Sequence, residues 1–253
     1  MEAKRFFFHA SRYQQGAVRF VCFPYAGAGG GVFKSWESQL PDYVDLMVAE
    51  LPGRGISFGD PLLCNMRDVV PQMADDFINY IDKPFVFFGH SLGALICFEL
   101  CKELRTRALP EPEVLIVSGR RAPHCPTDSQ YHLLSDDRLI DQLRNYEGTP
   151  DEILADADMM RLILPILRAD FTVAETYRYL DTKKFDFPIA AFGGKSDKGV
   201  PKDSLLKWSE FTKESFVWEM FDGAHFYLQQ RESKNLLLHR VCSILGSTLI
   251  LAR

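Results

Sequence analysis

A serine placed between two glycines is the feature of this sequence best suited to covalent chemistry. Gly89-His90-Ser91-Leu92-Gly93 lies between the apolar run 85–88 and a stretch with helical periodicity, 94–104. A sharp strand-to-helix turn exposes a serine hydroxyl beside a base, and flanking glycines let the chain bend there without a clash. The following helix would point its partially positive N-terminus at developing negative charge. We therefore predict that Ser91 is a nucleophile, and a plain turn is the alternative.

A serine nucleophile needs a general base, almost always a histidine. His225 follows the predicted strand 216–221 directly, so it would lie at the carboxyl edge of a sheet. The other histidines fit less well, because they lie near the N-terminus, beside Ser91, next to a helical segment or within an amphipathic helix: His9, His90, His124, His132 and His239. The sequence therefore indicates His225 as the base.

The histidine in turn needs a carboxylate that fixes its tautomer, and the expected chain order is serine, acid, histidine. Asp197 lies in the glycine-rich loop 193–201 just past the predicted strand 187–192. Such loops hold catalytic groups on a rigid scaffold. Asp222 also lies near a strand end, but only three residues before His225 it would have to fold back sharply. We predict Asp197, with Asp222 as the competitor.

Two backbone N–H groups should stabilise the oxyanion that forms when Ser91 attacks a carbonyl. Leu92, the residue after the nucleophile, supplies the first. The second is expected from the glycine-rich loop 23–31, where we prefer Ala26 to Tyr25. This loop lacks the third glycine of a dinucleotide fingerprint and the Gly-Lys-Ser/Thr of a P-loop, which leaves a structural turn as the alternative reading.

The remaining chain predicts the scaffold for these groups. Short apolar runs alternate with helix-period segments, the pattern of a mainly parallel central sheet flanked by helices on both faces. The predicted strands are 18–23, 46–51, 85–88, 114–118, 187–192 and 216–221, and amphipathic helices are predicted at 66–81 and 237–249. The alternation breaks at residues 126–179, where only helices are predicted. A helical lid over the carboxyl ends of the strands is expected there, and a helix pair on the sheet edge is the alternative.

Composition excludes several other classes of protein. The net charge of −5 over 253 residues, without a clustered basic stripe, argues against nucleic acid as a partner. The six cysteines show neither metal-site nor disulfide-scaffold spacing, so we expect reduced thiols that lie mostly in the core, and no metal. The N-terminus lacks the apolar span of a signal peptide and the apolar C-terminal run is too short to cross a bilayer. A cytoplasmic protein without membrane contact is expected.

Further sequence blocks give the chain a family resemblance that covers roughly residues 17 to 230. With the motif around Ser91 and the Gly-Ala-His-Phe block at His225, the chain resembles the type II thioesterases, stand-alone α/β-hydrolases that accompany polyketide, nonribosomal peptide and fatty acid synthases. The other matching blocks are Phe-Pro-Tyr-Ala-Gly (23–27), Leu-Pro-Gly-Arg-Gly (51–55), Ser-Gly-Arg-Arg-Ala-Pro (118–123), Gly-Thr-Pro (148–150) and Leu-Pro-Ile-Leu-Arg-Ala-Asp-Phe (164–171).

The resemblance implies one α/β-hydrolase domain over residues 1–253, with the helical lid at 126–179 inside it. It implies hydrolysis of acyl thioesters held on the phosphopantetheine arm of acyl or peptidyl carrier protein domains, which clears stalled acyl groups or releases product. No cofactor beyond that arm is implied, and a monomer is expected. Side chains expected to bind the acyl group are Tyr25, Leu133, Leu162 and Phe171.

Three other functions stay open at this stage. A carboxylesterase or acyltransferase could use the same fold and triad, and a chain-terminating thioesterase of fatty acid synthase belongs to a related branch. A docking module without catalysis is disfavoured, because all three triad residue types are present. The charges of Arg54, Arg120 and Arg121 suit either docking of an acidic carrier protein or structural ion pairs.

Overall fold

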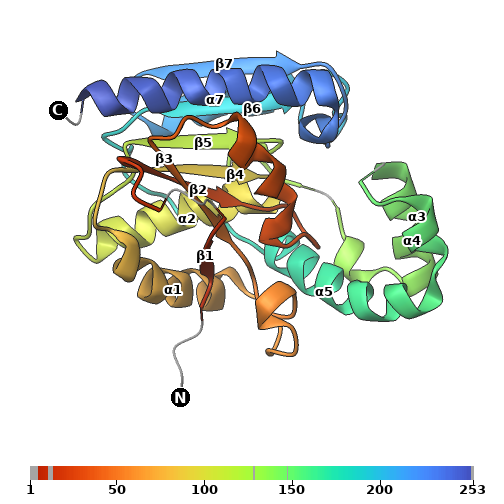
Figure 1. The fold of residues 1–253 in the computed structure, drawn as a ribbon. Helices are drawn as coiled ribbons and strands as arrows, with labels where there is room; N and C mark the ends of the chain where they lie inside the picture. Colours follow the sequence, from red (N-terminus) through yellow and green to blue (C-terminus); the bar gives the residue numbers. More distant parts are fainter. Residues whose placement is uncertain (1–4, 11–13, 128, 147, 252–253) are drawn as a thin grey trace.

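A seven-stranded sheet forms the centre of the computed structural model, which describes residues 5–10, 14–127, 129–146 and 148–251 (Figure 1). Its strand order is β1-β3-β2-β4-β5-β6-β7. Only β1 is antiparallel to its neighbour, β3. The strands are β1 (Phe7–His9), β2 (Val18–Phe23), β3 (Val44–Ala49), β4 (Phe85–His90), β5 (Val114–Ser118), β6 (Ile189–Gly194) and β7 (Phe216–Phe221). The predicted mainly parallel sheet is confirmed.

Helices cover both faces of the sheet because alternate strand residues point to opposite sides. From β2, Val21 and Phe23 join a core with α1 (Met66–Phe77) and α2 (Leu92–Thr106). Phe20 and Cys22 join a second core with the 3-10 helix η1 (Gly30–Gln39) and α7 (Arg231–Leu251). Figure 1 shows α1 and α2 below the sheet and α7 across its other face.

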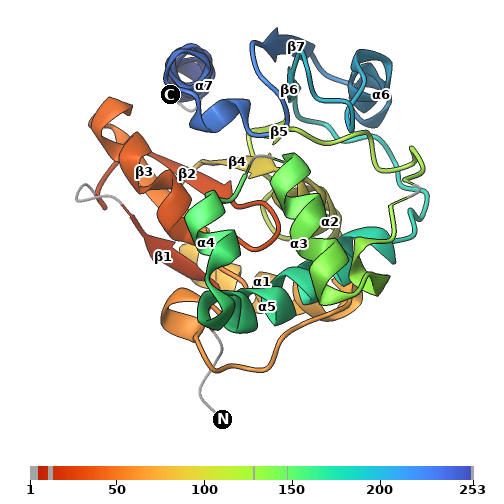
Figure 2. The same ribbon diagram turned by 90° about the vertical axis from the view of Figure 1, so that its right-hand side faces the viewer.

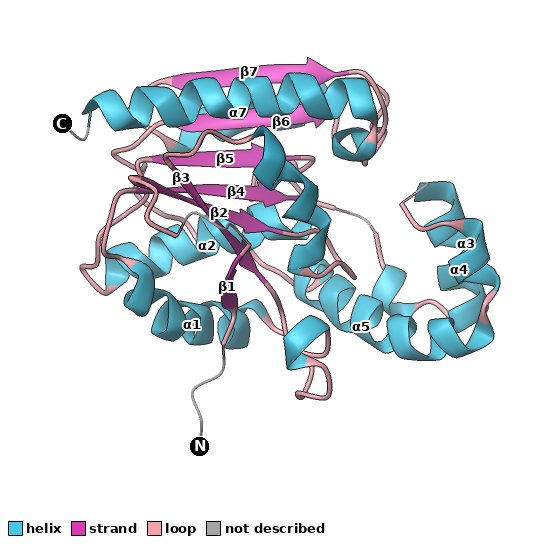
Figure 3. Cartoon of the chain, in the orientation of Figure 1, coloured by secondary structure: helices cyan, strands magenta, loops and turns pink. Residues whose placement is uncertain are grey.

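The segment between β5 and β6 is helical, as the sequence predicts. It holds η4 (Tyr131–Leu133), α3 (Asp136–Tyr146), α4 (Asp151–Ala155) and α5 (Ala157–Glu175). The arrowheads of β4 to β7 point toward α3 and α4 in Figure 3, and Figure 2 views this edge with α3 and α4 in front. The remaining short helices are η2 (Gly55–Ser57), η3 (Ile78–Tyr80), α6 (Lys202–Leu206), η5 (Lys207–Phe211) and η6 (Tyr227–Gln229).

Four strands differ from the prediction, and one of them, β4, runs two residues past its predicted end at residue 88. β3 begins two residues earlier than expected because Asp45, which interrupts the apolar run, is buried in an ion pair with Arg19 of β2 at 2.9 Å. β6 starts two residues later than predicted, after Pro188, which has no backbone N–H to donate. β1 is too short to give a periodic signal.

Half of the cysteines lie outside the core. Cys22, Cys97 and Cys101 are buried, and burial raises the pKa of each thiol well above its usual value. Cys64 is exposed, and Cys125 and Cys242 are half-buried, so the expectation of mostly core thiols is wrong for these three. None of the helices among the described residues combines the length and the apolar character that crossing a bilayer needs.

Candidate active site

Ser91 lies at a strained turn between β4 and α2. Its φ is +56° and its ψ is −113°, a conformation that non-glycine residues rarely adopt. A Cβ at Gly93 would come within 2.1 Å of the Phe23 carbonyl oxygen, and one at Gly89 within 2.4 Å of the Gly93 carbonyl oxygen. Only glycine fits at either position, so the two glycines permit the close packing on which this turn depends.

The structure brings the three predicted triad residues together in a hydrogen-bonded row. Ser91 Oγ lies 3.0 Å from His225 Nε2, and His225 Nδ1 lies 2.7 Å from Asp197 Oδ2. The Asp197 side chain is 3% exposed, and its other oxygen accepts the N–H of Gly199 at 2.8 Å. A buried carboxylate held in this way favours the histidine tautomer with a proton on Nδ1, which leaves Nε2 free to accept the serine proton.

Asp222, the competing carboxylate, points elsewhere. Its side chain is 81% exposed and accepts a hydrogen bond from Lys195 Nζ at 2.8 Å. The two acids therefore provide a matched pair for a test.

Asp197→Asn should keep the fold but lower kcat about 10⁴-fold, because an amide does not stabilise the histidine cation and favours the wrong tautomer. Asp222→Asn should leave kcat within about twofold, since the Asp222 carboxylate is exposed and pairs with an exposed lysine. Steady-state hydrolysis of one thioester by both variants, with thermal unfolding as the check on folding, measures this. A larger loss in Asp222→Asn than in Asp197→Asn would reverse the assignment.

Two backbone N–H groups are available beside Ser91. Ala26 and Leu92 both line the cavity that contains Ser91, and neither N–H donates to any residue within the described part of the chain. Leu92 is the first residue of α2, a position where the backbone N–H has no partner inside the helix. The neighbouring Gly27 N–H is taken, because it donates to Asp170 Oδ2 at 2.7 Å. This arrangement fits the predicted oxyanion hole at Ala26 and Leu92.

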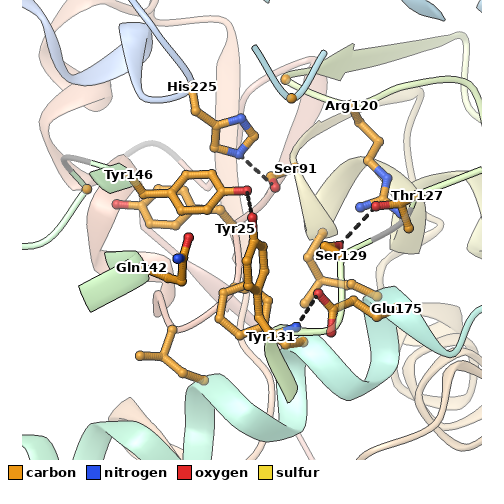
Figure 4. A pocket seen from close by; sticks show the side chains of 18 of the residues that line it. Tyr25, Ser91, Arg120, Thr127, Ser129, Tyr131, Gln142, Tyr146, Glu175 and His225 are labelled. Carbon is orange, nitrogen blue, oxygen red and sulfur yellow. Dashed lines mark hydrogen bonds between the residues drawn. The ribbon is translucent and has the colours of Figure 1, made fainter. Parts of the chain in front are cut away.

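A cavity of about 600 Å³ lies over Ser91 and His225, large enough for a small acyl chain. Its walls come from the carboxyl ends of the strands and from the helical segment, with Tyr131, Gln142 and Tyr146 on one side of Ser91 (Figure 4). Tyr25 and Phe171 line it, as expected from the sequence.

Leu133 and Leu162 do not line this cavity, so the prediction is wrong for them. Their side chains are 68% and 53% exposed. Other helical residues, Leu134, Leu143 and Leu167, supply the apolar wall instead. The sequence shows which residues of a helical segment are apolar, but the inward face depends on how the helices pack on the sheet.

Comparison with known proteins agrees with the fold and the site. A model of the thioesterase domain matches residues 19–247. The chain belongs to the thioesterase family. It is 40% identical over 242 residues to the gramicidin S biosynthesis protein GrsT of Aneurinibacillus migulanus, covering 95% of this chain and 94% of that protein.

Solved thioesterase structures are also similar along nearly the whole chain. RedJ, a thioesterase from the prodiginine biosynthetic pathway in Streptomyces coelicolor, is 33% identical with a TM-score of 0.87, over 93% of this chain and 89% of RedJ. The type II thioesterase BorB from the borrelidin biosynthetic cluster is 29% identical with a TM-score of 0.86, over 98% and 99%. The predicted α/β-hydrolase fold and the resemblance to type II thioesterases are confirmed.

Two sequence blocks of this thioesterase meet in a buried ion pair between Arg54 and Asp170. Arg54 Nη1 and Nη2 donate to the two oxygens of Asp170 at 2.6 and 2.7 Å, and both side chains are buried. Asp170 also accepts the Gly27 N–H, next to Ala26. α5 is therefore tied to the loop that would supply an oxyanion donor. For Arg54, structural ion pairing is the reading that fits.

A buried hydrogen-bonded row lies behind the triad. His90 Nδ1 is 2.8 Å from Ser118 Oγ, which is 2.5 Å from Tyr227 Oη. Burial, with a smaller contribution from repulsion by His225, lowers the pKa of His90 well below its ordinary value. The ring centroids of His90 and His225 are 5.1 Å apart, so a neutral His90 places no like charge beside the His225 cation.

No group of three or more His, Cys, Asp or Glu side chains within the described ranges is arranged to hold a metal ion.

Proposed function

We propose that this protein is a serine thioesterase that hydrolyses acyl thioesters carried on the phosphopantetheine arm of a carrier protein. The observation that carries the proposal is the row Ser91–His225–Asp197 beneath a cavity of about 600 Å³. Membership of the thioesterase family narrows the electrophile from esters in general to thioesters. The relatives named for antibiotic and natural-product pathways support a role beside a peptide or polyketide synthase.

The reaction would proceed in two halves through an acyl-enzyme. Ser91 Oγ attacks the thioester carbonyl carbon while His225 Nε2 takes the serine proton, and the carbonyl oxygen becomes an anion held by the N–H groups of Ala26 and Leu92. The C–S bond then breaks, the acyl group stays on Ser91, and the arm's sulfur leaves as a thiol with the proton from His225. Water, deprotonated by His225, hydrolyses the acyl-serine and releases the acid.

Asp197 would orient His225 and stabilise its cation in both halves. The helical segment 126–179 would act as a lid, because its residues form the cavity wall opposite the strand ends. We also propose that carrier domains deliver the arm to this edge of the sheet, and that the protein acts as a monomer.

Hydrolysis of a panel of acyl groups tests the substrate class. Each acyl group is offered on a carrier protein, on coenzyme A and as a simple alkyl ester. We expect kcat/KM for the carrier-bound form to exceed that for coenzyme A by about tenfold or more, since only the carrier adds protein contacts, and simple esters to be poorest. Equal or faster turnover of simple esters would favour a carboxylesterase. Acyl transfer to an added alcohol or amine in place of water would indicate an acyltransferase.

A further inference from the structure

Arg120 lines the cavity at a fixed place close to Ser91. It lies two residues past Ser118 at the end of β5, and the Ser118 carbonyl oxygen accepts the Ser91 N–H at 2.8 Å. Gly119 has a φ of +59°, and a Cβ there would come within 2.5 Å of the His90 ring. The Arg120 carbonyl oxygen accepts a hydrogen bond from Trp208 Nε1 at 2.9 Å. The backbone that carries this arginine is therefore held firmly beside the triad.

The guanidinium of Arg120 has no hydrogen-bonding or ion-pair partner within the part of the chain that the structure describes. Other arginines differ in this respect: Arg54 pairs with Asp170, and Arg105 with Glu111. Burial lowers the pKa of Arg120 to about 10, so the group still carries its charge at neutral pH. Arg120 is half-buried where it lines the cavity, and its five N–H donors favour an oxygen ligand.

The carboxylate that shares this cavity is already engaged. Glu175 accepts the N–H groups of Tyr131 and His132 at 3.0 and 3.1 Å, and it lies 2.6 Å from His132 Nδ1. The adjacent Arg121 also has no carboxylate partner among the described residues, because it donates to the carbonyl oxygens of Gly199 and Pro126. Among the described residues that line this end of the cavity, Arg120 and Arg121 are positively charged, and the carboxylate of Glu175 is bound to Tyr131 and His132.

The neighbourhood of Arg120 carries hydroxyl groups. The hydroxyls of Thr127 and Ser129 line the cavity on the same side of Ser91 as Arg120, 3.0 Å from each other, whereas Tyr146 lies on the other side (Figure 4). An acyl chain bound to Ser91 and directed toward Arg120 would meet the guanidinium and these two hydroxyls.

We propose that Arg120 is a specificity-determining residue that binds an oxygen acceptor, a carboxylate or an amide carbonyl, on the acyl chain beyond the thioester. The positive charge of Arg120 makes a carboxylate the stronger ligand, because charge-assisted hydrogen bonds are about twice as strong as neutral ones. The inference rests on the proposed function, since it assumes that the acyl group occupies this cavity during turnover.

Three pantetheine thioesters of matched size test the proposal: glutaryl, the glutaric monoamide and a branched alkyl acyl group of the same shape. We expect wild-type kcat/KM to be about tenfold or more higher for glutaryl than for the alkyl group, with the monoamide between them. Arg120→Met should abolish this ranking, and Arg120→Lys should retain part of the preference for glutaryl, because lysine keeps the charge without the fork of donors.

Arg161→Met provides the matched control, since Arg161 is 79% exposed, pairs with Asp158 and does not line the cavity. It should keep the wild-type ranking. A glutaryl-to-alkyl ratio that is the same in wild type and Arg120→Met would overturn the proposal. An equal loss for all three substrates in Arg120→Met would also overturn it, because that result places Arg120 on the pantetheine arm.

A second measurement separates this proposal from the proposed function. Free glutarate should slow labelling of Ser91 by a fluorophosphonate more in wild type than in Arg120→Met, and the branched alkyl acid should show no such difference. Protection of this kind without thioester turnover would refute the proposed function and leave the binding site standing. Thioester turnover with no differential protection and no substrate ranking would refute the role of Arg120 and leave the proposed function standing.

Discussion

Replacing Ser91 by alanine should lower thioester hydrolysis by roughly 10³- to 10⁶-fold without unfolding the protein. Among the described residues, the hydroxyl forms a side-chain hydrogen bond to His225 alone, so its loss removes the nucleophile and little else. Rate above the uncatalysed reaction should remain, because the N–H groups of Ala26 and Leu92 can still polarise a bound carbonyl. Single-turnover hydrolysis of an acyl-loaded carrier, with circular dichroism as the folding control, measures the effect.

His225→Ala should cause a loss of similar size, and the double variant should be scarcely slower than either single one. Serine and histidine act as a unit, since the hydroxyl attacks only when its proton has an acceptor, and effects within such a unit are strongly non-additive. Losses that multiply in the double variant would show that the two residues act independently. Fluorophosphonate labelling that persists in Ser91→Ala would identify a different nucleophile.

The core of the site could be predicted from the sequence because its signals are local. Ser91, Asp197 and His225 each follow a strand of a parallel sheet, and the carboxyl ends of parallel strands meet at one edge. The turn at Ser91, the predicted strands and the order of the residues along the chain were therefore enough to predict that these three distant residues lie together. The same logic predicts the oxyanion hole at Ala26 and Leu92, and both residues line the cavity.

The lining of the cavity and the exact ends of some strands depend on how the elements pack, and local sequence patterns do not show this. Leu133 and Leu162 are apolar residues of a helical segment, yet they face solvent, because the inward face is set by how α5 and η4 meet the sheet. The predicted start of β3 was wrong because Asp45 is polar yet buried. Its burial depends on the ion pair with Arg19 in the neighbouring strand. Polar residues with distant partners are thus the ones that local pattern reasoning misjudges.

Asp170 is the clearest case of a polar residue with a distant partner, and replacing it should have a large effect on both stability and turnover. Asp170→Ala should lower the free energy of unfolding by about 3–5 kcal/mol, because Arg54 is left as an uncompensated buried charge. It should also lower kcat more than it raises KM, since the Gly27 N–H loses its acceptor and the adjacent Ala26 N–H loses its fixed direction. Urea unfolding and steady-state kinetics of the same preparation report the two effects separately.

A paired substitution distinguishes the two roles of Asp170. Arg54→Met combined with Asp170→Leu removes both charges, and such apolar replacements of buried ion pairs are often neutral or stabilising. Stability should therefore recover in the double variant, whereas kcat should stay about 10²-fold or more below wild type, because leucine offers no acceptor to the Gly27 N–H. Recovery of both properties would mean that Asp170 serves stability alone. Recovery of stability without turnover would place the link from α5 to the oxyanion loop within the catalytic apparatus, as a positioning contact that ties the helical segment to the reacting carbonyl.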